Sequence, residues 1–143
     1  MKKPLIDITP FVNASTAFSN ALAIAKKVEA QNEADREPYM YEVCRAGVIQ
    51  HFEICYELSW KFMKRWLEKC NGDDVEGLSK KELFRLAQEK GLINDFEKWS
   101  SFASARNRTS HVYDEEVAED VYFIAKESKP YMEKLMAELE ARI

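Results

Sequence analysis

The sequence predicts an all-α fold, an up-and-down antiparallel four-helix bundle with one additional short helix. Only four glycines and four prolines occur in 143 residues, too few for the many tight turns of a sandwich or barrel. Apolar residues recur at three- and four-residue spacing, and no segment alternates with the two-residue period of a strand. The length fits one domain, residues 1–143, with a hydrophobic core of its own.

The first helix is expected over residues 10–31, with Thr9 as its N-cap and Pro10 at its first helical position. A polar connection follows and ends at Pro38. The second helix is expected over 39–70, the longest element of the chain. Its apolar residues form two neighbouring stripes, which predicts a central place in the bundle. The stripes are Val48, Phe52, Cys55, Ser59, Phe62 and Trp66, and Ile49, Glu53, Tyr56, Trp60, Met63 and Leu67.

Acidic side chains interrupt these stripes. Glu57 and Lys61 have the spacing of a favourable i,i+4 ion pair. Glu53 lies within an apolar stripe, where a carboxylate needs a partner. The sequence alone does not identify that partner.

Three further helices follow the Asn71-Gly72 break. Ser79 with Glu82 forms a capping box for a short third helix that ends before Gly91. Asn94 is expected to cap a fourth helix, with Glu97 three residues later. Asp114 and the two glutamates after it suit the start of a fifth helix. Pro130 should kink that helix because it removes one backbone hydrogen bond.

Composition excludes several classes of protein. Charged residues make up 32% and apolar residues 46%, an ordinary globular balance, and the net charge is −4. That charge disfavours DNA binding, while a local basic patch for a short RNA stays open. No window has the length of a membrane span or a signal peptide, so we expect no membrane and a cytoplasmic location. The three cysteines form no metal-binding or disulfide pattern, so we expect no metal, no cofactor and a core position for Cys55.

The stretch with the most chemistry runs from Arg106 to Tyr113. On a continuous helix, Asn107 would lie beside His111, and Arg106 would face the same side as Tyr113. A guanidinium, an imidazole, an amide and a phenol within about two turns can hold a phosphate and move a proton. The alternative is that the arginine and histidine only complement the negative end of a helix dipole.

Two runs of sequence resemble the nucleotidyltransferase substrate-binding protein family, a branch of the HEPN group of helical domains. One run, from Arg45 to Lys61, reads RAGVIQHFEICYELSWK. The other is Arg-Asn-x3-His-x-Tyr-Asp, from Arg106 to Asp114. The first run departs mildly from the family, with Ala-Gly after the arginine where Asp is common and Cys-Tyr where Thr-Phe is common. The resemblance extends from about Phe18 to Leu139.

The resemblance implies a homodimer that works with a minimal nucleotidyltransferase as its cognate partner. It further implies a metal-independent endoribonuclease toxin that acts on RNA, with Arg106 and His111 as catalytic residues. Asn107, a turn away from His111, is expected to support them by fixing the histidine tautomer or by bonding the scissile phosphate. In such pairs the transferase neutralises the toxin by attaching AMP to the tyrosine of the motif, here Tyr113. An alternative within the same family is a non-catalytic subunit that binds nucleotide or substrate for its transferase.

The chemistry of the motif is compatible with RNA cleavage. A histidine can deprotonate the 2′-hydroxyl or protonate the leaving oxygen, and an arginine can stabilise charge on the phosphorane. The chain is not expected to be the transferase itself, since it contains neither Gly-Ser nor Asp-x-Asp. The other histidine, His51, is interpreted as structural, and Arg108 as a solvated surface residue.

Overall fold

The computed structural model describes residues 6–143 and confirms the all-α fold. A π-helical turn, Trp66–Cys70, extends the second helix, and 3₁₀ turns cover Glu33–Asp35 and Thr109–His111. Residues 6–143 hold no strand. The five helices are α1 (Thr9–Ala30), α2 (Met40–Arg65), α3 (Lys80–Glu89), α4 (Phe96–Arg108) and α5 (Glu115–Arg142).

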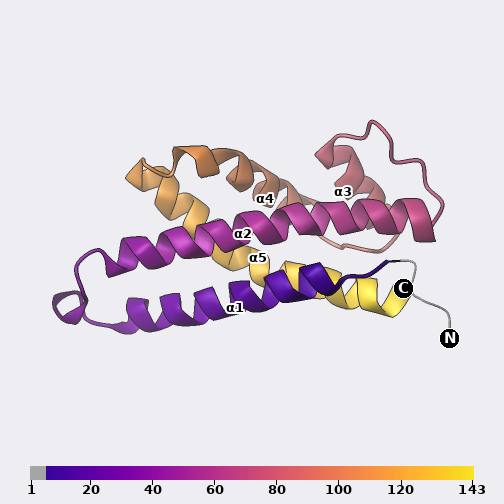
Figure 1. Ribbon diagram of the computed structural model, residues 1–143. Coiled ribbons are helices and arrows are strands. Elements are labelled where there is room, and N and C mark those ends of the chain that lie inside the picture. The colour runs from indigo at the N-terminus through magenta and orange to yellow at the C-terminus, as the bar shows by residue number, and fades with distance from the viewer. Residues whose placement is uncertain (1–5) are drawn as a thin grey trace.

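The four long helices alternate in direction, as an up-and-down bundle requires (Figure 1). α1 and α2 form one antiparallel hairpin, and α4 and α5 form the other. The short α3 lies beside the C-terminal end of α2. The α1–α2 connection and the α4–α5 junction lie at the same end of the bundle, and the C-terminus lies at the opposite end (Figure 1).

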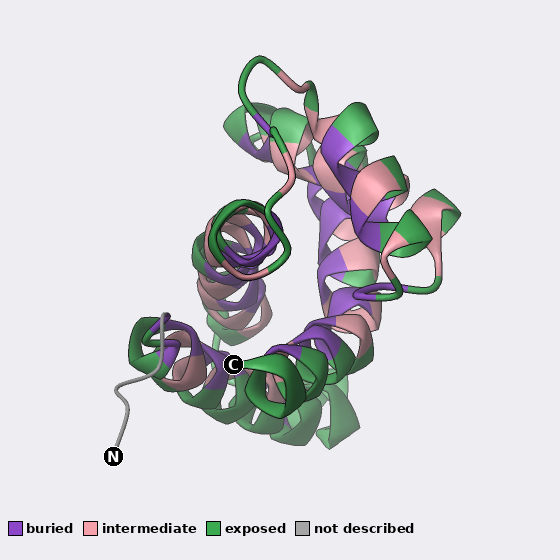
Figure 2. Cartoon of the chain, turned by 90° about the vertical axis from the view of Figure 1, so that its right-hand side faces the viewer, coloured by how far each residue is buried: buried purple, intermediate pink, exposed green. Residues whose placement is uncertain are grey.

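Buried residues lie on the helix faces turned toward one another, and exposed residues lie on the outside (Figure 2). A chain of ring contacts crosses the core from Tyr56 on α2 to Phe84 on α3, Trp99 and Phe102 on α4, and Tyr131 on α5. The successive ring centroids are 6.5, 5.8, 5.3 and 5.5 Å apart. Such aromatic pairs stabilise by about 0.5–1.5 kcal/mol beyond their buried area. They join α4 directly to α3 and α5, and α3 in turn to α2.

Helix ends agree with the sequence in three places. Ser79 accepts a hydrogen bond from the Glu82 amide, and the Glu82 carboxylate accepts one from the Ser79 amide, so the capping box is confirmed. Gly91 follows α3 with φ of 77°, the left-handed conformation that glycine tolerates best. Asp114 caps α5 by accepting from the Val117 amide.

Two predicted N-caps are wrong. α1 begins at Thr9 after Ile8, because both the amide and the hydroxyl of Thr9 donate to the Asp7 carboxylate instead of capping the helix. α4 begins one residue later than predicted, because Asp95, not Asn94, accepts from the amide three residues on.

Two further expectations concern the course of the helices. α5 continues through Pro130, and its kink there stays a prediction. Within residues 6–143, no helix combines the length and the apolar character that a bilayer crossing requires.

Candidate functional site

The motif residues lie at the α4–α5 junction, where the backbone departs from the geometry that the sequence suggested. α4 ends at Arg108, and a 3₁₀ turn over Thr109–His111 follows. The α-helical alignments of Asn107 with His111 and of Arg106 with Tyr113 are therefore wrong. A tighter turn changes the angle between successive side chains, so i,i+4 neighbours no longer share a face.

Arg106 faces α2 rather than open solvent. Its Nη1 lies 3.4 Å from Glu53 Oε2, and its Nε lies 3.3 Å from Glu57 Oε1. The Nε–H is buried and makes no well-directed hydrogen bond in spite of that distance. Arg106 is thus the partner of Glu53, the carboxylate within the apolar stripe whose partner the sequence alone did not identify. Glu57 lies beside Arg106, and within residues 6–143 it forms no ion pair with Lys61, the partner that its i,i+4 spacing favoured.

Arg106 also contacts the turn that carries the histidine. Its Nη1 donates to Thr109 Oγ1 at 2.9 Å, and the Thr109 hydroxyl donates to the Arg106 carbonyl at 2.8 Å. Thr109 begins the 3₁₀ turn that ends at His111. The guanidinium therefore braces the segment on which the imidazole is mounted.

His111 and Tyr113 are exposed side by side beyond that turn. The Tyr113 hydroxyl lies 3.3 Å from His111 Nδ1, and the two rings meet edge to face with centroids 5.9 Å apart. Tyr113 is 84% exposed, which is unusual for so large an aromatic side chain. Its hydroxyl is open to a reagent arriving from solution.

The two other polar residues of the motif have separate places. Asn107 is exposed on α4. Arg108 Nη1 lies 3.6 Å from Asp120 Oδ2 on α5, so this arginine is paired across the junction rather than free in solvent.

Sequence reasoning missed the role of a second arginine, Arg45 on α2. Its side chain is buried, its Nη1 donates to Glu115 and Glu119 at 2.7 Å each, and its Nη2 donates to Glu115 at 2.9 Å. These bonds hold the pKa of the Glu115 carboxyl below its usual value. Tyr41 donates to both oxygens of Glu119 at 2.8 and 2.9 Å. This cluster anchors the first turns of α5, directly after Tyr113, to α2.

A groove of about 520 Å³ opens beside Arg106, between α2, the start of α3 and α4. Sequence reasoning missed the residues at its outer edge. Lys80 Nζ lies 3.5 Å from the centroid of the Trp60 ring, and Trp60 Nε1 donates to Glu57 at 2.9 Å. The residues that line the groove are Tyr56, Glu57, Trp60, Ser79, Lys80, Lys81, Ser100, Ala103, Ser104, Arg106 and Asn107.

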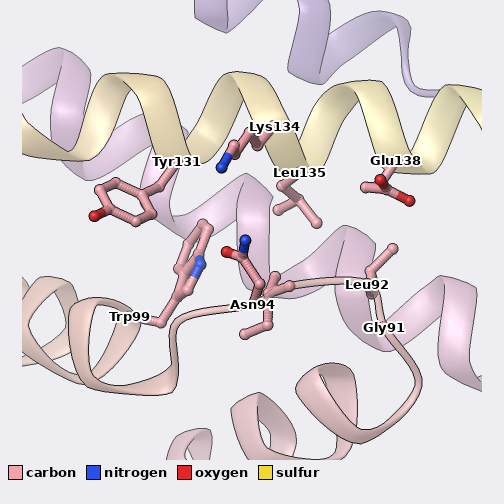
Figure 3. A pocket seen from close by; sticks show the side chains of 9 residues that line it. Gly91, Leu92, Asn94, Trp99, Tyr131, Lys134, Leu135 and Glu138 are labelled. Atoms are coloured by element: carbon pink, nitrogen blue, oxygen red, sulfur yellow. The ribbon is translucent and has the colours of Figure 1, made fainter.

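A smaller cavity of about 130 Å³ lies away from the motif, between α5 and the α3–α4 connection. Tyr131 and Leu135 project from α5 on one side, and Trp99 on α4 faces them from the other (Figure 3). Trp99 and Leu135 are buried members of the core. This cavity is therefore a seam in the packing of the core.

The remaining sequence predictions concern cysteines and metals. Cys55 is buried in the core as predicted, and burial raises the pKa of its thiol to about 11. His51 is half-buried on α2. Across residues 6–143, acidic, histidine and cysteine side chains form no cluster that could hold a metal ion.

Two solved structures share this fold. A Haemophilus influenzae protein, described as a substrate binding domain of a nucleotidyltransferase, matches with a TM-score of 0.78 and 34% identity, over 91% of this chain and 98% of that one. A Thermus thermophilus protein matches with a TM-score of 0.64 and 30% identity, over 85% of this chain and 98% of that one.

Sequence comparison agrees with the structural matches. The probable ribonuclease HepT of Haemophilus influenzae is 39% identical over 109 residues, which are 74% of this chain and 75% of that protein. Residues 8–141 match the family described as nucleotidyltransferase substrate binding protein like. The chain belongs to this nucleotidyltransferase substrate-binding protein family.

Proposed function

We propose that this protein is the helical partner of a minimal nucleotidyltransferase and cleaves RNA without a metal, using Arg106 and His111. The observation that carries the proposal is an exposed His111–Tyr113 pair on a turn that Arg106 braces. A structural histidine at a helix end would need neither an exposed phenol beside it nor an arginine tied to its turn. The name of the Haemophilus relative, a probable ribonuclease, points in the same direction.

In the proposed reaction the 2′-hydroxyl attacks the neighbouring phosphorus, and the bond from phosphorus to the 5′-oxygen breaks. The products are a 2′,3′-cyclic phosphate and a 5′-hydroxyl. An imidazole can take the proton from the 2′-oxygen or give one to the 5′-oxygen. The Arg106 guanidinium would stabilise charge on the phosphorane oxygens, and Asn107 would donate a further hydrogen bond.

One histidine at the site cannot be base and acid in the same step. A homodimer that brings two copies of the α4–α5 junction into one cleft would supply both. We therefore include a homodimer in the proposal, with His111 of each copy acting on opposite sides of one phosphate.

Tyr113 is the proposed target of the partner transferase. Its oxygen would attack the α-phosphate of ATP, with pyrophosphate leaving and the phenol proton passing to solvent or a base. The product replaces the hydroxyl near His111 with a charged, bulky phosphodiester. RNA phosphate would then be excluded by repulsion and by steric overlap.

The test is cleavage of single-stranded RNA in EDTA by wild type and by His111→Ala, with matched unfolding curves. Cutting by wild type alone supports the ribonuclease. If neither protein cuts the RNA, and intact mass shows that Tyr113 is unmodified, the ribonuclease proposal is wrong. Incubation with the partner and ATP should add AMP to wild type but not to Tyr113→Phe, whose cutting should be retained.

A second candidate is a non-catalytic subunit that binds nucleotide or substrate for the transferase. The observation that favours it is the pairing of Arg106 with Glu53 and Glu57, which compete with a phosphate for the guanidinium. The description of the solved Haemophilus structure as a substrate binding domain agrees with it. In that case His111→Ala weakens binding, and neither protein cuts RNA.

A further inference from the structure

We propose that the groove beside Arg106 holds a second phosphodiester of a single-stranded RNA, next to the one at Arg106, through Lys80 and Lys81. This inference rests on the proposed function and names the subsite through which RNA would reach the reacting residues. Five features of the groove support it: its charge, the seating of Lys80, the position of both lysines on α3, its unpaired polar atoms, and its size.

The groove has a net positive charge, although the chain as a whole is negatively charged. Three cations line it, Lys80, Lys81 and Arg106, against one carboxylate, Glu57. The whole chain carries a net charge of −4. Another hollow, at the start of α5, is lined only by Glu115, Glu116, Glu119 and Asp120. A polyanion is therefore drawn to the groove and repelled from the hollow on α5.

Lys80 is held in place rather than swinging freely in solvent. Its ammonium lies on the face of the Trp60 ring, 3.5 Å from the centroid. The Trp60 indole is in turn fixed by its hydrogen bond to Glu57. A cation seated on an aromatic ring loses less side-chain entropy when a phosphate arrives. This arrangement makes Lys80 a prepared anion site at the edge of the groove.

The two lysines occupy helix positions where positive charge is unfavourable. Lys80 and Lys81 are the first two residues of α3, at the positive end of its dipole. Positive charge there is unfavourable for the helix, and sequences that break such local rules often do so for function. A phosphate bound at this end would be attracted by both lysines and by the helix dipole.

Unpaired polar atoms also concentrate in the groove. Within residues 6–143, four buried side-chain nitrogen or oxygen atoms have no hydrogen-bond partner. Two of the four, Ser100 Oγ and Arg106 Nε, belong to residues that line this groove. A buried polar atom without a partner is costly, and a ligand that supplies the missing bond repays that cost. A phosphate or ribose oxygen would accept from these covered atoms only after a neighbouring side chain moves, such as Glu57 away from Arg106.

The size and shape suit a flexible single strand. The volume of about 520 Å³ lies in the range of sites that hold one nucleotide-sized ligand. Asn107 and Arg106 line the same groove as the lysines, so a strand lying in it continues to the motif. Duplex RNA, which is read across a wide and shallow surface, does not fit a groove of this kind.

The experiment measures binding of a short single-stranded RNA that is 2′-O-methylated throughout and therefore cannot be cut. Wild type is compared with the double variant Lys80→Gln/Lys81→Gln across a series of salt concentrations. The control is Lys26→Gln/Lys27→Gln, which makes the same charge change at an exposed lysine pair on α1. ATP and AMP serve as competing ligands. Thermal unfolding of all three proteins checks the fold.

Lys80→Gln/Lys81→Gln should bind the RNA about tenfold more weakly, and its salt slope should fall by about 0.7, the contribution of the one phosphate that the two lysines hold. Its melting temperature should change little, because relief of the α3 dipole offsets the lost contact between Lys80 and Trp60. The control should bind as wild type does. With cuttable RNA, KM should rise about tenfold and kcat change less than about twofold.

Equal RNA binding by wild type and Lys80→Gln/Lys81→Gln overturns the inference, as does an equal loss in the control. Loss of ATP binding in the groove variant with unchanged RNA binding also overturns it and assigns the groove to a free nucleotide. The binding assay does not depend on cleavage. If RNA binding depends on the two lysines but cuttable RNA is never cleaved, the ribonuclease proposal is wrong and the RNA subsite is still supported.

Discussion

Two arginines of this protein each face two carboxylates on a neighbouring helix, yet the two clusters differ in burial and in the length of their contacts. Arg45 has a side chain 7% exposed and lies 2.7 Å from both Glu115 and Glu119. Arg106 is 35% exposed, and its nearest carboxylate oxygens lie 3.3 and 3.4 Å away. Burial raises the pKa of Tyr41, which bonds to Glu119 in the Arg45 cluster, to about 12.

The difference separates an arginine that holds the fold from one that is available for binding. The hydrogen bonds of Arg45 are short and paired, so any other ligand would have to break them. Arg106 keeps an unsatisfied Nε–H and loose ion pairs, so a phosphate can replace its carboxylates at little cost. Substitutions in each cluster test this difference.

The largest expected effect is on catalysis, from Arg106→Lys. Cleavage should slow by about 100- to 1,000-fold, because a lysine cannot present paired N–H groups to the phosphorane. The free energy of unfolding should change by less than about 1 kcal/mol, as for other half-exposed ion pairs. Single-turnover cleavage and urea unfolding measure the two quantities. A large stability loss with normal cleavage would give Arg106 a structural role.

The next effect is on stability, from Arg45→Met. We expect the free energy of unfolding to fall by about 2 kcal/mol, less than for a fully buried ion pair because the carboxylates can reach water. Arg65→Met, the same change at an exposed position of α2, is the control and should cost less than about 0.5 kcal/mol. Equal losses in the two variants would contradict an anchoring role for Arg45.

A smaller effect is expected from the double variant Glu53→Gln/Glu57→Gln. Removal of the competing carboxylates should tighten RNA binding by up to about fivefold, the value of a half-exposed ion pair. The control is Glu42→Gln/Glu68→Gln, which removes the same charge from two exposed positions. Glu42 lies in the first turn of α2, and Glu68 lies in the π-helical turn that extends α2. Weaker binding in Glu53→Gln/Glu57→Gln would mean that the carboxylates position Arg106 instead of competing with RNA.

Sequence patterns predicted the helices because helix boundaries depend on neighbouring residues. The capping box at Ser79 and the N-cap at Asp114 were read from a few residues each and are confirmed. The prediction of Asn94 as the cap of α4 failed because its neighbour Asp95 can cap equally well, and Asp95 accepts the hydrogen bond from the Lys98 amide. Likewise, the local sequence pattern does not predict that a 3₁₀ turn replaces the α-helix after Arg108.

The partners of the arginines depend on contacts between residues far apart in the chain. Arg45 lies 70 positions before Glu115, and no local pattern joins them. Glu53 could be marked as a carboxylate in need of a partner, but Arg106 is supplied by another helix. The signal that could have found Lys80 and Lys81 was present: two cations in the first turn of a capped helix oppose its dipole.

The smallest effect concerns acid stability and tests the Arg45 cluster from its other side. The Arg45 hydrogen bonds lower the pKa of Glu115 below 4.5, so the unfolded chain binds a proton at a higher pH than the folded chain does. The stabilisation is therefore complete above pH 4.5 and is lost as the pH falls through the folded pKa. Urea unfolding across this range should show a weaker acid dependence in Glu115→Gln than in wild type. Glu116→Gln, at an exposed neighbour, should match wild type. Unchanged acid dependence in Glu115→Gln would leave Glu119 as the effective partner of Arg45, and the contrast with Arg106 would then rest on burial.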